Sequence, residues 1–131
     1  SIVHSKKRKP DMIFVGTDIV PISRIEKLIK EKGIHFLNHV FTKLEQNICD
    51  GKNSPSIHYS GKFAAKEAVK KALLSAKSFP HIPVKSIEIQ NDTDGTPVVQ
   101  IVKDGIIYKQ LIVSISHAGE YATATAILEL E

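Results

Sequence analysis

Two carboxylates occur where an ionised side chain is costly. Asp18 lies near the end of residues 12–20, a run of β-branched and aromatic residues with the length and composition of a buried strand. Glu67 lies in the longest helical pattern of the chain, residues 60–74. A carboxylate in apolar surroundings needs a counter-charge, a cation or a shifted pKa. Asp18 and Glu67 are therefore the first candidates for chemistry.

Each carboxylate also has an ordinary explanation. Glu67 precedes Lys71 by one helical turn, and such pairs are common surface ion pairs of small energetic worth. Asp18 can begin a turn or cap the following helix. The strand pattern favours chemistry at Asp18, because Gly16 shares its face and leaves space there for a helix or a ligand. The pattern by itself leaves both explanations of Glu67 open.

The helix predicted for residues 60–74 is expected to be covered on two sides. Phe63 and Leu74 lie on one side with Glu67 between them, which is unusual for a face in water. At 100° per residue the other apolar residues form a second, mostly small arc, which lets another layer approach the backbone. They are Ala64, Ala65, Ala68, Val69, Ala72 and Leu73.

The remaining patterns predict an α+β fold in which a mainly antiparallel sheet packs against the long central helix. After the first strand, apolar spacing predicts a helix at residues 22–33, and 35–41 form a short apolar segment. Thr42 and Glu45 form a capping-box pattern that opens another short helix. A loop at 51–56 precedes the long helix, which ends near residue 77. Strands are predicted at 85–90, 98–103, 106–108, 111–117 and 121–130.

The composition indicates a single globular domain. The chain has 131 residues, of which 42% are hydrophobic and 24% charged. Its one cysteine, Cys49, excludes an internal disulfide and favours a reducing compartment, so we expect a cytoplasmic protein. No apolar run approaches the length of a membrane span. We expect residues 12–131 to form the domain and 1–11 to be a basic, flexible tail without a signal sequence.

The net charge of +4 favours anionic partners: nucleic acid, phosphorylated cofactors or an acidic protein. Much of this charge comes from the tail, which contains Lys6, Lys7, Arg8 and Lys9. No basic patch interleaved with aromatic residues is present, so binding to nucleic acid rests on net charge alone. A small basic protein that binds nucleic acid or an acidic partner without chemistry is therefore the alternative to an enzyme.

The familiar catalytic motifs are absent from the sequence. It contains neither a phosphate-binding Walker loop nor a dinucleotide-binding glycine motif, and its scattered histidines do not form a zinc pattern. Two carboxylates alone suit acid/base hydrolysis. Two carboxylates with nearby lysines suit a different task, since Mg²⁺ prefers one or two carboxylates, waters and substrate phosphates. The residues therefore favour metal-assisted phosphate chemistry.

Four segments resemble the holo-acyl-carrier-protein synthase family of small 4′-phosphopantetheinyl transferases. They are VGTDIVxIxRI at residues 15–25, FAAKEAxxKA at 63–72, DGxP at 94–97 and SISH at 114–117. The resemblance extends over nearly all of residues 12–130. It implies an α+β subunit that forms homotrimers with active sites at the subunit interfaces. It also implies Mg²⁺-dependent transfer of phosphopantetheine from coenzyme A to a serine of acyl carrier protein, for fatty acid biosynthesis.

The resemblance implies three catalytic residues. Asp18 and Glu67 match the family's Mg²⁺ ligands, which bind through the pyrophosphate of coenzyme A, and Lys71 matches a lysine near the reacting phosphate. In this scheme the carrier serine attacks the β-phosphate and adenosine 3′,5′-bisphosphate leaves. The proton acceptor is either Glu67 or a metal-bound water.

The resemblance also implies contacts with coenzyme A and with the carrier protein. Arg24, on the first predicted helix, matches a residue that meets the acidic carrier protein. Lys27 on the same helix would add to this basic surface, although its spacing is also that of an ordinary solvated face. No partnership with nucleic acid or a membrane is implied. A further set lines the nucleotide and phosphate side: Lys62, Lys66, Lys71 and His117. Position 62 is often arginine in the family, and lysine lacks the bidentate grip of arginine on a phosphate. We expect the alanine arc of the long helix to pack on the sheet, with Glu67, Lys66 and Lys71 facing the pyrophosphate.

Overall fold

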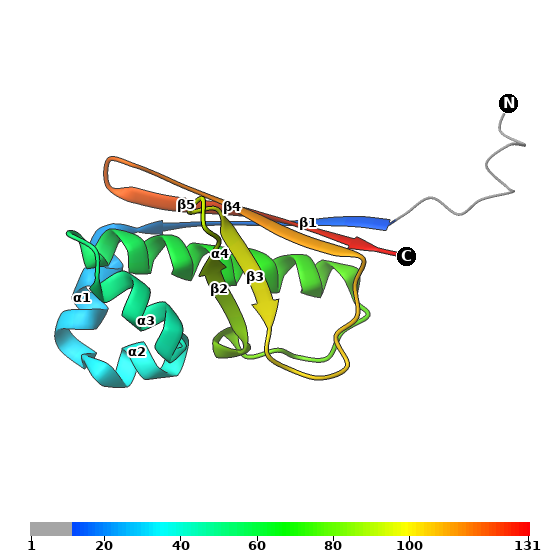
Figure 1. Cartoon of the computed structure of the whole chain (residues 1–131), viewed down its shortest axis with the longest axis horizontal. Helices are drawn as coiled ribbons and strands as arrows, with labels where there is room; N and C mark the ends of the chain where they lie inside the picture. Colours follow the sequence, from blue (N-terminus) through cyan, green and yellow to red (C-terminus); the bar gives the residue numbers. More distant parts are fainter. Residues whose placement is uncertain (1–11) are drawn as a thin grey trace, which may run out of the picture.

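The computed structural model describes residues 12–131, and the basic tail predicted for residues 1–11 lies outside them. The fold is α+β, as predicted, with one long helix against a sheet (Figure 1). In chain order the elements are β1 (Met12–Pro21), α1 (Ile22–Lys32), α2 (Ile34–Val40), α3 (Lys43–Asp50), α4 (Pro55–Ala76), the 3₁₀ turn η2 (Val84–Ser86), β2 (Ile87–Asn91), β3 (Pro97–Ile101), β4 (Gln110–Ala118) and β5 (Tyr121–Leu130).

The main sheet has three antiparallel strands in the order β1-β5-β4, and β2 and β3 form a separate hairpin. Figure 1 shows α4 lying along one face of the three-stranded sheet, with α1 to α3 gathered near the beginning of α4. Register places Asp18 of β1 opposite Ala124 of β5, and Ala124 opposite Ile115 of β4. β1, which carries Asp18, and β4, which carries Ile115, therefore lie at opposite edges of this sheet.

The backbones of β1 and α4 approach each other closely at Gly16. A Cβ built at Gly16 would lie 1.9 Å from the carbonyl oxygen of Ala68 and 2.6 Å from the nitrogen of Ala72, both in the α4 backbone. Only a residue without a side chain fits this contact. The space that the sequence predicts beside Asp18 is thus filled by the long helix.

The alanine arc of α4 is buried, as predicted, with Ala64, Ala65, Ala68 and Ala72 fully enclosed. The opposite side agrees only in part with the prediction. Phe63 is half-buried and packs against the core, whereas Leu74 is 57% exposed in the protomer. The helix is therefore covered on its second side near Phe63 and open near its C-terminal end.

Some local features differ from the sequence-based expectation, and others confirm it. The long helix begins at Pro55, inside the predicted loop, because proline suits the first helical position, where its missing N–H has no helical acceptor. Residues 35–41 fall largely within α2, while 106–108 form no strand. The capping box is confirmed: the Glu45 N–H donates to Thr42 Oγ1 at 3.2 Å, and the Thr42 N–H to Glu45 Oε1 at 2.8 Å.

The sheet face turned away from α4 carries exposed apolar side chains. Alternate residues of β1 and β5 face the helix and are buried, so the intervening residues point outward. We call this surface the open sheet face; its large members are Ile13, Val15, Ile19, Ile112, Tyr121 and Ile127. Contiguous apolar surface of this kind is typical of an interaction site. Within residues 12–131, no helix is both long and apolar enough to cross a membrane.

Candidate functional site

Asp18 projects from the α4-facing side of β1 and contacts a lysine of α4. The Lys71 ammonium donates to Asp18 Oδ1 at 3.0 Å and to the Thr17 carbonyl oxygen at 2.9 Å. The Asp18 side chain is 15% exposed and that of Lys71 is 53% exposed. Asp18 does not cap the following helix, because Pro21 occupies the N-cap of α1 and no side chain caps it. This aspartate is therefore a polar group held beside α4 and still open to solvent on one side.

Glu67 lies one helical turn before Lys71 on α4. Lys71 is engaged by Asp18, and within residues 12–131 Glu67 has no ion-pair or hydrogen-bond partner. The surface pair between Glu67 and Lys71, the ordinary explanation, is thus not formed. Glu67 is half-buried and lines a cavity of about 400 Å³, whose walls include Phe63, Lys70, His39, His81 and Val84.

These residues form the carboxylate half-site, which we define as Asp18, Glu67 and Lys71. Its donor set suits a hard divalent cation, since within residues 12–131 neither the Glu67 carboxylate nor Asp18 Oδ2 takes part in a hydrogen bond or ion pair. No cluster of three or more His, Cys, Asp or Glu side chains that could hold a metal occurs within the described part of the chain. A cation here would take at most these two carboxylates and complete its shell with water and substrate oxygens.

A second group of predicted residues meets at the other edge of the sheet. Lys62 of α4 and His117 of β4 line a pocket of about 460 Å³, together with Lys52 and His58. We call these four side chains and the space between them the basic pocket. Its far wall is the β2–β3 turn, which contributes Asn91, Asp92, Thr93, Gly95 and Pro97. That wall also contains the Asp92 carboxylate, whose Oδ1 accepts the N–H groups of Asp94 and Thr96 at 2.9 Å.

The electrostatics of the basic pocket favour an anion. Partial burial lowers the pKa of His58, and three neighbouring positive groups act in the same direction: Lys52, His117 and Lys62. Burial likewise lowers the pKa of Lys62, which is 5% exposed. A bound phosphate would favour the charged forms of His58 and Lys62.

Lys52 and His58 were not among the residues predicted from the sequence. Lys52 lies in an irregular segment without periodicity, and His58 lies before the predicted start of the long helix. A helix begun at Pro55 places His58 one turn before Lys62, on the same side. His58 could therefore have been predicted as a site residue by taking Pro55 as the first residue of the helix.

The expectation that Lys66 faces the phosphate side is corrected by the structure. The Lys66 ammonium is bound by Glu45 of α3, and both side chains are fully buried. It also lies 5.5 Å from the centre of the Phe41 ring. Lys66 therefore belongs to the core between α3 and α4 and lines neither the cavity at Glu67 nor the basic pocket.

The two groups do not form one site within a protomer. Asp18 is on β1 and His117 on β4, with β5 between them, which separates the two strands by about 10 Å. Arg24 and Lys27 lie exposed on α1, the helix that directly follows the Asp18 strand. The protomer thus carries the carboxylate half-site at one edge of the sheet and the basic pocket at the other.

Comparisons with known proteins agree on one family. The family model of the 4′-phosphopantetheinyl transferase superfamily matches residues 14–126. The holo-[acyl-carrier-protein] synthase of Protochlamydia amoebophila is 45% identical over 116 residues, which cover 86% of this chain and 94% of that protein. The synthase of Chlamydia pneumoniae is 42% identical over 121 residues, covering 89% and 97%.

Solved structures with the same fold include two with coenzyme A. The ACPS–CoA complex of Chronobacterium ammoniagenes superposes with a TM-score of 0.79 at 29% identity, covering 92% of this chain and 98% of that one. The Helicobacter pylori holo-[acyl-carrier-protein] synthase in complex with coenzyme A superposes with a TM-score of 0.76 at 31% identity, covering 87% and 98%.

Proposed function

The chain belongs to the 4′-phosphopantetheinyl transferase superfamily, and we propose that it is a holo-acyl-carrier-protein synthase. It transfers the 4′-phosphopantetheine group of coenzyme A to a serine of apo acyl carrier protein and releases adenosine 3′,5′-bisphosphate. Relatives over nearly the whole chain bear that name, and neighbouring structures are complexes with coenzyme A. The observation that carries the proposal is the Asp18–Lys71 contact one helical turn from Glu67, which has no ion-pair partner within residues 12–131. The reaction serves cytoplasmic fatty acid biosynthesis.

Asp18 and Glu67 would hold Mg²⁺, and the ion would supply positive charge to the pyrophosphate oxygens as the phosphoryl group transfers. Lys71 adds a fixed ammonium beside the same oxygens, where developing charge is stabilised without rearrangement. Asp18 orients that ammonium, since it accepts from Lys71 at 3.0 Å. The serine hydroxyl gives its proton to Glu67 or to water as its oxygen bonds to the β-phosphorus. The bond from that phosphorus to the bridging oxygen breaks, and adenosine 3′,5′-bisphosphate leaves with that oxygen.

The basic pocket binds the adenosine bisphosphate part of coenzyme A in this proposal. Its volume of about 460 Å³ suits a nucleotide, and its basic groups suit the phosphates. Lys62 and His117 contribute as the resemblance implies, and Lys52 and His58 join them. Lys62 Nζ already donates to the Ile89 carbonyl and to Asn91 Oδ1, both at 3.0 Å. It therefore acts as a nearby positive charge, where arginine would offer a bidentate grip.

We further propose that three copies associate through the open sheet face and complete each other's sites. An apolar surface of this extent on a small protein needs a partner, and a second copy supplies one with the same chemistry. The carboxylate half-site and the basic pocket lie at opposite edges of that sheet. A ring of copies would bring the carboxylate half-site of one subunit to the basic pocket of the next. Each coenzyme A would then span two subunits.

Placing a charge on the open sheet face is expected to dissociate the trimer. Ile127→Lys puts an ammonium at the centre of this face, on β5, where an interface would bury it unpaired. Light scattering after size exclusion should change from the mass of a trimer to that of a monomer, and transfer should fall at least roughly tenfold. Ile107→Lys is the control, since Ile107 is 82% exposed and lies off the sheet. A trimeric, active Ile127→Lys protein would refute this assembly.

Carrier recognition is proposed to be electrostatic, through Arg24 and Lys27 of α1. We expect Arg24→Glu to raise the KM for carrier protein by roughly 3- to 10-fold and to weaken the salt dependence of transfer. The KM for coenzyme A should not change. Lys32→Glu is the matched control, because it makes the same charge reversal at the far end of the same helix. Equal effects of the two substitutions would show that net charge, and not Arg24, recognises the carrier.

The proposed function is tested by mass spectrometry of the carrier. Incubation of the protein with coenzyme A, Mg²⁺ and apo acyl carrier protein should add one phosphopantetheine group to the carrier. A carrier that a known synthase modifies and this protein does not would overturn the proposal. A non-catalytic basic module predicts no modification, and a carboxylate-pair hydrolase predicts activity that persists in a chelator.

A further inference from the structure

We propose that the buried Glu45–Lys66 ion pair positions the walls of the basic pocket and thereby sets the affinity for coenzyme A without touching it. The inference rests on the proposed function, because it treats the basic pocket as the nucleotide site. Neither Glu45 nor Lys66 lines that pocket. Both are positioning residues in this account, acting through β2 and α3.

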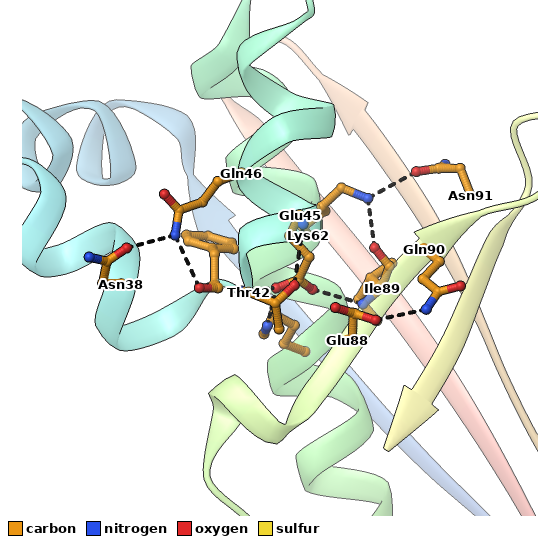
Figure 2. A network of polar contacts seen from close by, with 11 residues as sticks. Asn38, Thr42, Glu45, Gln46, Lys62, Glu88, Ile89, Gln90 and Asn91 are labelled. Atoms are coloured by element: carbon orange, nitrogen blue, oxygen red, sulfur yellow. Dashed lines mark hydrogen bonds and ion pairs between the residues drawn. The ribbon is translucent and has the colours of Figure 1, made fainter. Parts of the chain in front are cut away.

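Glu45 joins three elements through its two carboxylate oxygens. Oε1 accepts from the Lys66 ammonium of α4 and from the Thr42 N–H at 2.8 Å, where it caps its own helix, α3. Oε2 accepts from the Ile89 N–H of β2 at 2.7 Å. Figure 2 shows Glu45 between Thr42 and Ile89, with Lys62 and Asn91 alongside. One carboxylate therefore holds α3, α4 and β2 together at a single point.

The other side of Ile89 is held by the pocket itself. Lys62 Nζ donates to the Ile89 carbonyl at 3.0 Å and to Asn91 Oδ1 at 3.0 Å (Figure 2). Lys62 and Lys66 are one turn apart on α4. Lys62 binds the backbone carbonyl of Ile89 directly, and Lys66 binds Glu45, which accepts from the Ile89 N–H. One turn of α4 therefore holds both backbone polar groups of Ile89. A shift of Ile89 would carry Lys62 and Asn91 with it.

Both walls of the basic pocket are connected to the contacts between Glu45 and Ile89. The β2–β3 turn begins at Asn91, two residues after Ile89. The opposite wall includes Ile48, which lies on α3 one turn after Glu45, and Lys52 just beyond the helix. The spacing between the turn and α3 therefore depends on the contacts that Glu45 makes with Ile89 and Lys66.

The ion pair is a costly way to fill this space if packing were its only role. Apolar residues of similar volume often replace a buried ion pair without loss of stability, whereas removing one partner leaves a buried, unpaired charge. Apolar residues have no directional bond to the Ile89 N–H. Beyond packing, the ion pair fixes the position of β2 relative to α3. That position determines the distance between the two walls of the basic pocket.

The test removes both charges together and measures nucleotide affinity separately from catalysis. For Glu45→Leu/Lys66→Met, which removes both charges and the acceptor of the Ile89 N–H, we expect a folded protein, a KM for coenzyme A raised roughly 10-fold and a kcat changed less than about 3-fold. Titration calorimetry with adenosine 3′,5′-bisphosphate, without carrier protein, should show the same rise in Kd. Ile87→Val is the matched control, because it trims a buried residue of β2 outside these contacts and should leave KM and Kd unchanged.

A second variant keeps the test informative if the double variant does not fold. Glu45→Asp retains the charge for Lys66 but shortens the reach to Ile89, and we expect the same rise in KM and Kd. Variants with the KM and Kd of the wild type would overturn this proposal, as would equal losses in Ile87→Val. A wild-type protein that neither binds the bisphosphate nor modifies the carrier would instead overturn the proposed function.

Discussion

Replacing Asp18 by alanine is expected to lower kcat for phosphopantetheine transfer by roughly 100- to 1,000-fold and leave the protein folded. The substitution removes one of the two carboxylates that would hold Mg²⁺ and frees the Lys71 ammonium, which Asp18 holds at 3.0 Å. The Asp18 side chain is small and 15% exposed, so its removal leaves no large cavity. Glu67→Gln should act in the same direction, since it keeps the side chain's shape and removes the charge. Steady-state rates with a purified carrier protein measure both effects.

The control for Asp18→Ala is Glu120→Ala, which removes an exposed carboxylate at the β4–β5 turn near the same end of the sheet. Its kcat should equal that of the wild type. A second readout is the rise in melting temperature that Mg²⁺ with coenzyme A produces in the wild type, which Asp18→Ala should reduce to the rise produced by coenzyme A without Mg²⁺. An Asp18→Ala protein with near-normal kcat would exclude this aspartate from the reaction and would leave only the role of a partner for Lys71.

Local pattern is enough to predict the elements that hold the carboxylate half-site. The first strand, the helix after it, the capping box at Thr42 and the last strand are found almost to the residue. Each is encoded in neighbouring residues: an apolar run, a helical stripe, a cap and its partner, and an alternation of alanine with threonine. Gly16 and Asp18 can be interpreted together for the same reason, since they lie two residues apart on one strand.

Lys66 and Glu45 show where local pattern fails. Each residue is explained by its local pattern: Lys66 belongs to a lysine-rich helix and Glu45 to a capping box. Neither pattern indicates that the two side chains are in contact. Their contact joins positions 21 residues apart and exists only because α3 folds back onto α4. A lysine is rarely buried without a counter-charge, so its partner decides where it lies. That partner becomes visible only in three dimensions.

Replacing Gly16 by alanine is expected to lower the free energy of unfolding by about 3 kcal/mol or more. The added methyl would overlap the carbonyl oxygen of Ala68 and the nitrogen of Ala72. Both are backbone atoms of a long helix, so no side-chain rotation relieves the overlap and α4 must move away from β1. Since Asp18 is on the same strand face, we also expect its contact with Lys71 to lengthen and transfer to fall. Chemical denaturation and steady-state rates measure the two effects.

The matched control is Gly51→Ala, the same one-methyl change at the end of α3. Gly51 has φ −78° and ψ −2°, which any residue adopts, and an added Cβ would come no closer than 3.5 Å to another atom. This substitution should be neutral or slightly stabilising, because alanine reduces the freedom of the unfolded chain. If Gly16→Ala were equally harmless, β1 and α4 would have room to separate, and the close approach at Gly16 would not be what aligns Asp18 with Lys71.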